Sequence, residues 1–247
     1  MKVVILAGGL GTRLSELTKI TPKPMVKIGG VPIIIHIMNH YLNYGFKDFI
    51  LATGYKNKEF TKYFKNFKKF GKEFNSTLFN KDCRVTILNT GVKTMTGGRL
   101  KKTSKYLDKN KHFMFTYGDG ISSVNLSKLY KYHIKRKKLI TVTAVRPPAR
   151  FGEIIIKKNI VTSFKEKPQV TNGWINGGFF IAHKAFLKFI KKDQDILEKK
   201  PLETVCKKKQ LSAFKHEGFW KCMDVKRDRD ELEKIYTINK FKWKKIN

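Results

Sequence analysis

Short apolar runs rich in branched and aromatic side chains alternate, along the first 145 residues, with longer segments of helical spacing. The first run, residues 2–7, leads into the glycine-rich residues 8–11, a pattern typical of a fully buried strand that enters a tight turn. Pro32 opens a longer apolar segment that stops before Gly45, and proline near the start with glycine past the end favours a helix. Further strands are expected at residues 49–52, 84–88, 112–117, 140–145 and 179–182, and further helices at residues 99–107 and 126–135.

This alternation predicts an α/β fold with a Rossmann-like, mainly parallel sheet flanked by helices. After residue 145 the pattern changes to a smaller, β-containing C-terminal portion. Two short strands and a lysine-rich helix are expected there, at residues 153–157, 160–165 and 197–208. No repeat and no linker rich in Gly, Ser or Pro is present, so we expect one domain over residues 1–247. Residues 56–81, rich in Lys, Phe and Asn, are compatible with a mobile arm, a lid or an exposed helix.

Charge narrows the classes of partner. The 247 residues include 53 Lys and Arg against 19 Asp and Glu, a net charge of +34, which points to phosphorylated small molecules, nucleic acids or acidic membranes. A disordered polyelectrolyte would not also hold 19 Phe, so the chain is expected to fold around a core. The basic runs at residues 135–138, 191–192 and 207–209 are scattered and belong to no recognisable nucleic-acid-binding module. We interpret them as solvated faces and do not expect a nucleic-acid partner.

Cysteine usage and hydropathy indicate the compartment. Cys83, Cys206 and Cys222 are far apart and form no Cys-x-x-Cys pair, so neither a disulfide framework nor a zinc knuckle is indicated. No apolar run approaches the roughly 20 residues of a membrane span, and residues 3–7 are too short for the core of a signal peptide. We therefore expect a cytoplasmic protein with no membrane partner.

Residues 6–13, Leu-Ala-Gly-Gly-Leu-Gly-Thr-Arg, carry the strongest local signal for phosphate chemistry. Glycines at the end of a strand let backbone N–H groups approach phosphate oxygens closely, and Arg13 adds a fixed cation. An ordinary tight turn between a strand and a helix would also use such glycines. No Gly-Lys-Ser/Thr follows, and Leu14 stands where a dinucleotide-binding motif needs its third glycine. A P-loop and a hydride-transfer site are therefore disfavoured.

Lys23, Asp119 and Asp224 are the candidate charged groups of a phosphate site. Lys23 lies between two prolines, which restrict the positions that its ammonium group can reach. Asp119 follows the expected strand 112–117, so it would lie at the carboxyl edge of the sheet, where ligands bind. Its oxygens suit a Mg²⁺ ion that bridges nucleotide phosphates, and Asp224 could supply a second carboxylate. The alternatives are a solvated lysine, an Asx-turn aspartate and a helix cap.

Two other patterns carry less weight. His36 and His40 lie four residues apart, but Ile37 occupies the glutamate position of a His-Glu-x-x-His zinc site, so helix packing is the better interpretation. No Gly-x-Ser-x-Gly elbow or Cys/His nucleophile pair is present. Direct phosphoryl or nucleotidyl transfer requires neither.

Together these motifs resemble the sugar-1-phosphate nucleotidyltransferases over nearly the whole chain. The motifs shared by the family correspond to residues 6–13, Pro22-Lys23-Pro24, Gly118-Asp119 and Glu166-Lys167-Pro168. The segments similar to its cytidylyl branch are residues 94–100, 174–180 and 216–220. Several independent motifs in one order are hard to obtain by chance.

The resemblance implies a Mg²⁺-dependent enzyme that transfers CMP from CTP to α-D-glucose 1-phosphate and releases pyrophosphate, without a protein nucleophile. The product would be the entry to CDP-linked deoxysugars of bacterial surface polysaccharides such as O-antigen. Residues 1–145 would form mainly the nucleotide-binding half. Residues 146–247 would form mainly the sugar-phosphate half and the C-terminal helices.

The resemblance also implies roles for single residues. Arg13 and Lys23 would face the phosphates as catalytic groups, and Asp119 and Asp224 would bind the metal ion. The nucleotide-binding residues would be Leu6, Ala7, Gly8, Gly9, Leu10, Gly11, Thr12, Arg13, Lys23, Thr94, Arg99 and Gly118. The sugar-phosphate-binding residues would be Gly152, Glu166, Lys167, Asn176 and Gly177, the two glycines allowing close approach.

The chain departs from the family pattern at two places, and alternatives stay open. Residues 56–81 are shorter and more basic than the family segment, and Val225 follows Asp224 where threonine is usual. The family is commonly oligomeric, so a homo-oligomer is expected, although a charge of +34 opposes close association unless basic faces point outward. The glycine turn does not reveal which base is read, so a uridylyl- or thymidylyltransferase is one alternative. A basic nucleic-acid-binding protein without catalysis is another.

Overall fold

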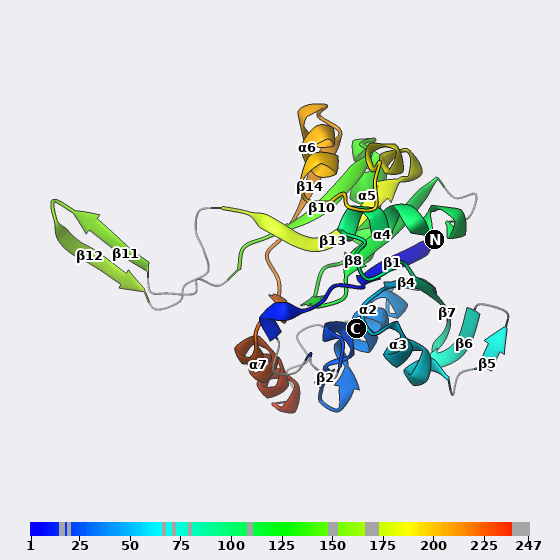
Figure 1. The fold of residues 1–247 in the computed structure, drawn as a ribbon. Coiled ribbons are helices and arrows are strands. Elements are labelled where there is room, and N and C mark those ends of the chain that lie inside the picture. The colour runs from blue at the N-terminus through cyan, green and yellow to red at the C-terminus, as the bar shows by residue number, and fades with distance from the viewer. Residues whose placement is uncertain are drawn as a thin grey trace.

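Strands from both halves of the chain form one nine-stranded sheet in the computed structural model (Figure 1). The structure describes residues 1–14, 18, 21–65, 68–70, 73–78, 81–107, 111–147, 153–165 and 173–238. In sheet order the strands are β14 (Leu211–His216), β10 (Ile140–Val145), β13 (Ile175–His183), β8 (His112–Tyr117), β1 (Lys2–Ala7), β4 (Asp48–Thr53), β7 (Lys81–Asn89), β6 (Glu73–Leu78) and β5 (Lys68–Phe70). The central strands β8, β1, β4 and β7 pair in parallel, as do β10 and β14. The predicted mainly parallel sheet is thus confirmed, with β13 and β6 running against their neighbours.

Three small two-stranded sheets complete the strands. They are β2 (Lys27–Ile28) with β3 (Val31–Pro32), β9 (Gly120–Ser122) with β15 (Trp220–Cys222), and β11 (Glu153–Lys157) with β12 (Ile160–Lys165). The β11–β12 hairpin stands clear of the main sheet, at the far left of Figure 1. The β9–β15 pair, in contrast, ties the C-terminal segment to the end of β8 and so bears directly on the site described below.

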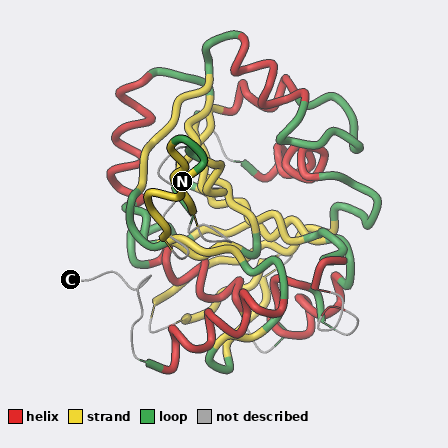
Figure 2. The backbone as a smooth tube through the Cα atoms, turned by 90° about the vertical axis from the view of Figure 1, so that its left-hand side faces the viewer, coloured by secondary structure: helices red, strands yellow, loops and turns green. Residues whose placement is uncertain are grey.

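Helices cover both faces of the sheet, which Figure 2 shows edge-on between red segments. One face packs against α2 (Ile33–Leu42), α3 (Asn57–Phe64), α5 (Leu126–Arg136) and α7 (Lys226–Thr237). The other packs against α4 (Thr96–Lys102), α6 (Lys200–Lys207) and the 3₁₀ turns Thr103–Tyr106 and Lys184–Phe189. Two further 3₁₀ turns are Thr12–Leu14 and Lys23–Met25. Successive side chains of β1 enter opposite cores. Val3 and Ile5 enter one and Val4 and Leu6 the other, which is why the strand is apolar after Lys2.

The apolar pattern predicted the buried strands and the amphipathic helices well. Strands 112–117, 140–145, 153–157 and 160–165 have the predicted bounds, and the helix after Pro32 ends at Leu42. The helix predicted near residues 197–208 begins later, at Lys200, with Pro201 in its first turn. No apolar pattern predicted β9 and β15, which are three residues each, or the bounds of the C-terminal helix α7, in which only Leu232 is buried. Residues 56–81 contain α3 followed by β5 and β6, so the helix alternative holds for the first part alone.

The histidines and cysteines singled out in the sequence have structural surroundings. Nε2 of His36 lies 2.9 Å from the carbonyl oxygen of Ile28, and Nε2 of His40 lies 2.9 Å from that of Val124. Both rings are buried against neighbouring elements, as expected for helix packing. The thiols of Cys83, Cys206 and Cys222 are unpaired. Within the described residues no helix has the length and apolarity needed to cross a membrane.

Three histidines cluster where β8 begins: His133 is buried, and His112 and His183 are half-buried. Nε2 of His133, on α5, lies 3.0 Å from Nδ1 of His112, and its Nδ1 lies 2.7 Å from the hydroxyl of Thr141. The His183 ring packs edge-on against His112. Burial lowers the pKa of His133 to about 4, and repulsion from the two other imidazoles contributes. His133 is therefore neutral in the folded protein at neutral pH.

This cluster makes the stability of the fold depend on pH. In the unfolded chain, His133 takes up a proton as the pH falls below its ordinary pKa of 6.5. In the folded chain, it stays neutral until about pH 4, because its pKa is lowered to about 4. The free energy of unfolding should therefore fall by about 2–3 kcal/mol as the pH drops through this window. Urea unfolding at pH 7 and pH 4.5 measures this loss. His133→Gln should show a smaller loss than the wild type, and an equal loss would contradict the prediction.

Candidate active site

A cavity of about 650 Å³ opens at the carboxyl ends of β1 and β8. This is the sheet edge at which ligands bind in open α/β folds, and the volume suits a small molecule. The cavity is lined by residues 6–12, Lys23, Pro24, residues 92–96, Arg99, Tyr117, Gly118, Asp119 and Asp224. The structure thus brings together nearly all of the described residues that the sequence assigned to nucleotide and metal.

The turn after β1 needs its glycines for different reasons. Gly11 has a φ of +66°, in the left-handed region, and a Cβ there would lie 3.1 Å from the side chain of Thr18. A Cβ on Gly8 would lie 2.1 Å from Nη1 of Arg99, so this glycine makes room for a guanidinium group. Among the residues that the structure describes, none has an atom within 4 Å of the Cβ position of Gly9, which lines the cavity. The backbone is therefore open to a ligand at Gly9 in particular.

Arg99 is buried at the wall of the cavity and ties neighbouring loops together. Its Nη1 donates to the carbonyl oxygen of Thr53 at 3.0 Å and to the hydroxyl of Thr90 at 2.6 Å. Nη1 and Nη2 also donate to the carbonyl oxygens of Gly91, at 2.8 Å, and Val92, at 3.2 Å. Burial lowers the pKa of Arg99, but a guanidinium group stays charged in proteins. Arg99 thus lines the cavity and, through these hydrogen bonds, also ties its wall together.

Gly97 and Gly98, at the start of α4, receive a loop that is distant in sequence. The N–H groups of both glycines donate to the carbonyl oxygen of Asp195, at 2.9 and 3.3 Å, and that of Met95 donates to Asp193 at 2.8 Å. A Cβ on Gly98 would lie 2.2 Å from the carbonyl oxygen of Asp193. Packing against this loop therefore accounts for the paired glycines of residues 94–100. The docked loop in turn fixes the wall formed by residues 92–96.

Lys23, Asp119 and Asp224 meet at the cavity. Nζ of Lys23 lies 2.6 Å from Oδ2 of Asp119 and 2.7 Å from Oδ1 of Asp224. The lysine side chain is only 12% exposed, so water screens these interactions poorly. Burial lowers the pKa of Lys23, but attraction and hydrogen bonds to the two carboxylates outweigh it and the net shift is upward. Two carboxylates thus converge on a single cationic group.

The pairing of β15 with β9 brings Asp224 next to Asp119. The N–H of Met223 donates to the carbonyl oxygen of Asp119 at 2.9 Å. In the first turn of α7, the Asp228 carboxylate accepts from the N–H groups of Asp224 and Val225, at 2.9 and 3.0 Å. Val225, the residue that departs from the family pattern, is the N-cap and provides no side-chain cap. Asp228 supplies the local hydrogen bonds instead.

The residues assigned to the sugar phosphate are less fully brought together. Asn176 and Gly177 lie on β13, outside the residues that line the cavity. Oδ1 of Asn176 accepts from the N–H of Gly178 at 2.8 Å, and its Nδ2 donates to the hydroxyl of Tyr117 at 3.3 Å. A Cβ on Gly177 would lie 2.8 Å from the side chain of Val145, so packing against β10 accounts for this glycine. Gly152, Glu166 and Lys167, and the side chain of Arg13, lie outside the described residues.

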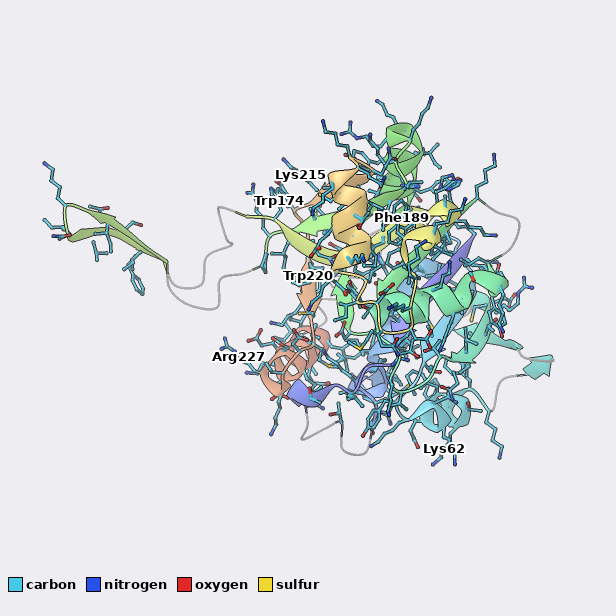
Figure 3. The ribbon with its side chains drawn as sticks, turned by 45° about the horizontal axis from the view of Figure 1, so that its top comes forward. Lys62, Trp174, Phe189, Lys215, Trp220 and Arg227 are labelled. Carbon is cyan, nitrogen blue, oxygen red and sulfur yellow. The ribbon has the colours of Figure 1, made fainter. Side chains whose placement is uncertain are left out.

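The two C-terminal motifs, residues 174–180 and 216–220, contact each other. Nε1 of Trp220 donates to the carbonyl oxygen of Gly177 at 2.7 Å. The Trp174 ring lies 4.4 Å from the guanidinium carbon of Arg146 and 5.2 Å from Nζ of Lys215, and Figure 3 shows it beside Lys215. These contacts join the start of β13 to the strand and turn that lead to Asp224.

The candidate site residues drawn from the sequence omitted several that lie at the site, among them Thr96, Tyr117 and Cys222. Thr96 and Tyr117 line the cavity. The available signals were the position of Tyr117 at the end of a parallel strand and that of Thr96 inside the motif of residues 94–100. The third residue, Cys222, has its Sγ 3.9 Å from a carboxylate oxygen of Asp224. Burial and the nearby carboxylates raise the pKa of Cys222 to about 12, so the thiol stays protonated and is a poor nucleophile.

The fold and the cavity, with its glycine-rich turn and one lysine between two carboxylates, agree with the class of the nucleotidyltransferases. Residues 2–225 match the family described as Nucleotidyl transferase, and the chain belongs to this family.

Curated relatives align with almost the whole chain. "Glucose-1-phosphate cytidylyltransferase" of Salmonella typhimurium is 42% identical over 256 residues, covering 99% of each chain. "Probable glucose-1-phosphate cytidylyltransferase" of Bacillus subtilis is 35% identical over 257 residues, again with 99% of each chain covered. Among solved structures, HddC from Yersinia pseudotuberculosis superposes with a TM-score of 0.71 at 25% identity, covering 95% of this chain and 99% of that one. These similarities agree with the fold and the site described above.

The loop docked on α4 predicts the effect of Gly98→Ala. The added methyl group would lie 2.2 Å from the Asp193 carbonyl oxygen, so the loop or the helix must shift. We expect the free energy of unfolding to fall by about 1–3 kcal/mol, although alanine is intrinsically the better helix residue. Urea unfolding followed by circular dichroism measures the change. Gly120→Ala is the control, because no atom in the described part of the chain lies within 4 Å of its Cβ position. Equal stability of the two variants would contradict the docking argument.

Proposed function

We propose that this protein transfers CMP from CTP to α-D-glucose 1-phosphate and releases CDP-glucose and pyrophosphate in a Mg²⁺-dependent reaction. The observation that carries the proposal is the convergence of Lys23, Asp119 and Asp224 in a cavity walled on one side by a glycine-rich turn. The two relatives whose names state a glucose-1-phosphate cytidylyltransferase support the choice of base and sugar.

The reaction needs little covalent chemistry from the protein. A phosphate oxygen of glucose 1-phosphate attacks the α-phosphorus of CTP in line with the departing pyrophosphate, so one P–O bond forms as another breaks. Lys23 is in position to neutralise phosphoryl charge, and the backbone N–H groups of residues 8–12 can bind phosphate oxygens. Arg13 is proposed as a second cation. Alignment and charge neutralisation would then supply the rate enhancement.

Asp119 and Asp224 would hold the Mg²⁺ ion. The fit rests on donor chemistry, because these are hard carboxylate oxygens and both already contact one cation, the Lys23 ammonium group. The described residues contain no cluster of three or more His, Cys, Asp or Glu able to hold a metal. That suits an ion which takes its other ligands from phosphate and water. When bound, the ion would supply positive charge to the reacting phosphates.

Further parts of the proposal concern the second substrate and the context. We propose that Glu166, Lys167 and Asn176 bind glucose 1-phosphate, with Gly152 and Gly177 beside it. We also propose that the protein works in the cytoplasm as a homo-oligomer and that its product enters the synthesis of CDP-linked deoxysugars, as in O-antigen. The fourfold set of a glycine turn, one lysine and two carboxylates disfavours the alternative of a non-catalytic nucleic-acid-binding protein.

Pyrophosphate release from the purified protein tests the proposal. With Mg²⁺ and glucose 1-phosphate present, CTP should be turned over, while UTP, dTTP, ATP and GTP should give little release, and a control without the sugar phosphate should give none. Preference for UTP or dTTP would overturn the assignment of the base and keep the transfer. No release with any nucleotide, from folded protein, would contradict the function and favour nucleic-acid binding, detectable by its steep salt dependence.

Asp119→Asn tests the metal-binding role. The change keeps the shape of the side chain but removes its charge, so kcat should fall by roughly two to three orders of magnitude, most steeply at limiting Mg²⁺. Steady-state rates over a Mg²⁺ titration measure this effect. The control is Asp48→Asn, which breaks a 2.7 Å ion pair with Arg84 at the start of β4, at the opposite edge of the sheet. Turnover of Asp119→Asn close to that of the control would count against the role.

A further inference from the structure

Glu198 connects two walls of the cavity although it does not line the cavity itself. One carboxylate oxygen accepts a hydrogen bond from the hydroxyl of Tyr117, and the other accepts from the hydroxyl of Thr96 at 2.8 Å. Both partners do line the cavity, Tyr117 at the end of β8 and Thr96 at the start of α4. A single carboxylate therefore joins the strand end beside Asp119 to the wall of residues 92–96.

The backbone at Glu198 is held without help from its side chain. The preceding residue, Leu197, is fully buried, and its N–H donates to the hydroxyl of Thr96 at 2.9 Å. Residues 193–195 are docked on α4 by the hydrogen bonds described above. The Glu198 side chain, in contrast, is exposed. Its carboxylate can therefore be removed without taking a group out of the core.

Packing holds the Tyr117 ring in place, so the hydrogen bond to Glu198 determines the orientation of the hydroxyl group alone. The ring makes an edge contact with Phe180, with centroids 5.9 Å apart, and lies 2.8 Å from where a Cβ on Gly178 would be. Its hydroxyl also accepts the 3.3 Å hydrogen bond from Nδ2 of Asn176. Burial and the charge of Glu198 raise the pKa of Tyr117, so the hydroxyl stays protonated. It therefore donates a hydrogen bond to the Glu198 carboxylate. Each hydrogen bond of this series therefore has a defined donor: the Asn176 amide donates to the Tyr117 hydroxyl, which donates to the Glu198 carboxylate.

We propose that Glu198 is a positioning residue for the sugar phosphate. By accepting a hydrogen bond from Tyr117, it orients the Tyr117 hydroxyl at the strand end beside Asp119 and, through it, the amide of Asn176, which lies outside the residues that line the cavity. Its second hydrogen bond, to Thr96, connects this end to the wall of the proposed nucleotide site. The inference rests on the proposed function and deepens it, since it names a residue through which binding of the second substrate is organised.

Kinetics of Glu198→Ala with CTP and glucose 1-phosphate as varied substrates test this role. Loss of a hydrogen bond to a charged group that acts through a second residue should raise the KM for glucose 1-phosphate about tenfold. The KM for CTP and kcat should each change by less than about threefold. Glu203→Ala is the matched control, because Glu203 is an exposed glutamate in the first turn of α6 and its removal changes the net charge equally. Glu198→Gln, which can still accept from Tyr117, should recover most of the loss.

A double-mutant cycle tests the route through Tyr117. If Glu198 acts through this hydroxyl, Tyr117→Phe combined with Glu198→Ala should be no worse than Tyr117→Phe alone. Additive effects would overturn the proposal, as would a Glu198→Ala variant that matches the Glu203→Ala control or that raises both KM values equally. A wild-type protein that forms no CDP-glucose would instead contradict the proposed function. An active wild type with an unaffected Glu198→Ala variant contradicts this inference alone.

Discussion

Two carboxylates that share one small volume repel each other unless a cation lies between them, and Lys23 meets this constraint for Asp119 and Asp224. The three residues come from the beginning, middle and end of the chain, so their meeting depends on most of the fold. Parallel pairing of β1 with β8 sets the sheet edge, and pairing of β9 with β15 delivers the second carboxylate. Lys23 thus offsets the repulsion between the two carboxylates in the site without a ligand.

The wall of the cavity is held in place by hydrogen bonds and close packing within the protein. Arg99 uses its donors on the carbonyl and hydroxyl oxygens of the surrounding loops, and Gly8 lacks a side chain because the guanidinium group lies there. The loop before α6 docks on α4 in the same supporting manner. A cavity wall that is already ordered lowers the entropy cost of binding a flexible nucleotide, because the protein groups do not have to be ordered as well.

Sequence reasoning succeeded where the signal is local. The apolar runs gave the central strands, and the position of Asp119 after such a run placed it at the ligand-binding edge. It failed where the cause is a distant partner. Nothing near Gly98 reveals that Asp193 will lie against it, and nothing near Tyr117 reveals Glu198. The three-residue strands β9 and β15 are too short to show alternation, although they decide where Asp224 lies.

The β9–β15 pairing also determines the order in which the parts of the site come together during synthesis. During synthesis the glycine turn, Lys23 and Asp119 leave the ribosome long before residue 224, and the lysine can then pair with one carboxylate only. The short strand β9 has no partner until Trp220–Cys222 arrives. A nascent or truncated chain that stops before this segment therefore holds only the neutral pair of Lys23 and Asp119, and the site gains its second carboxylate as the last part of the fold is added.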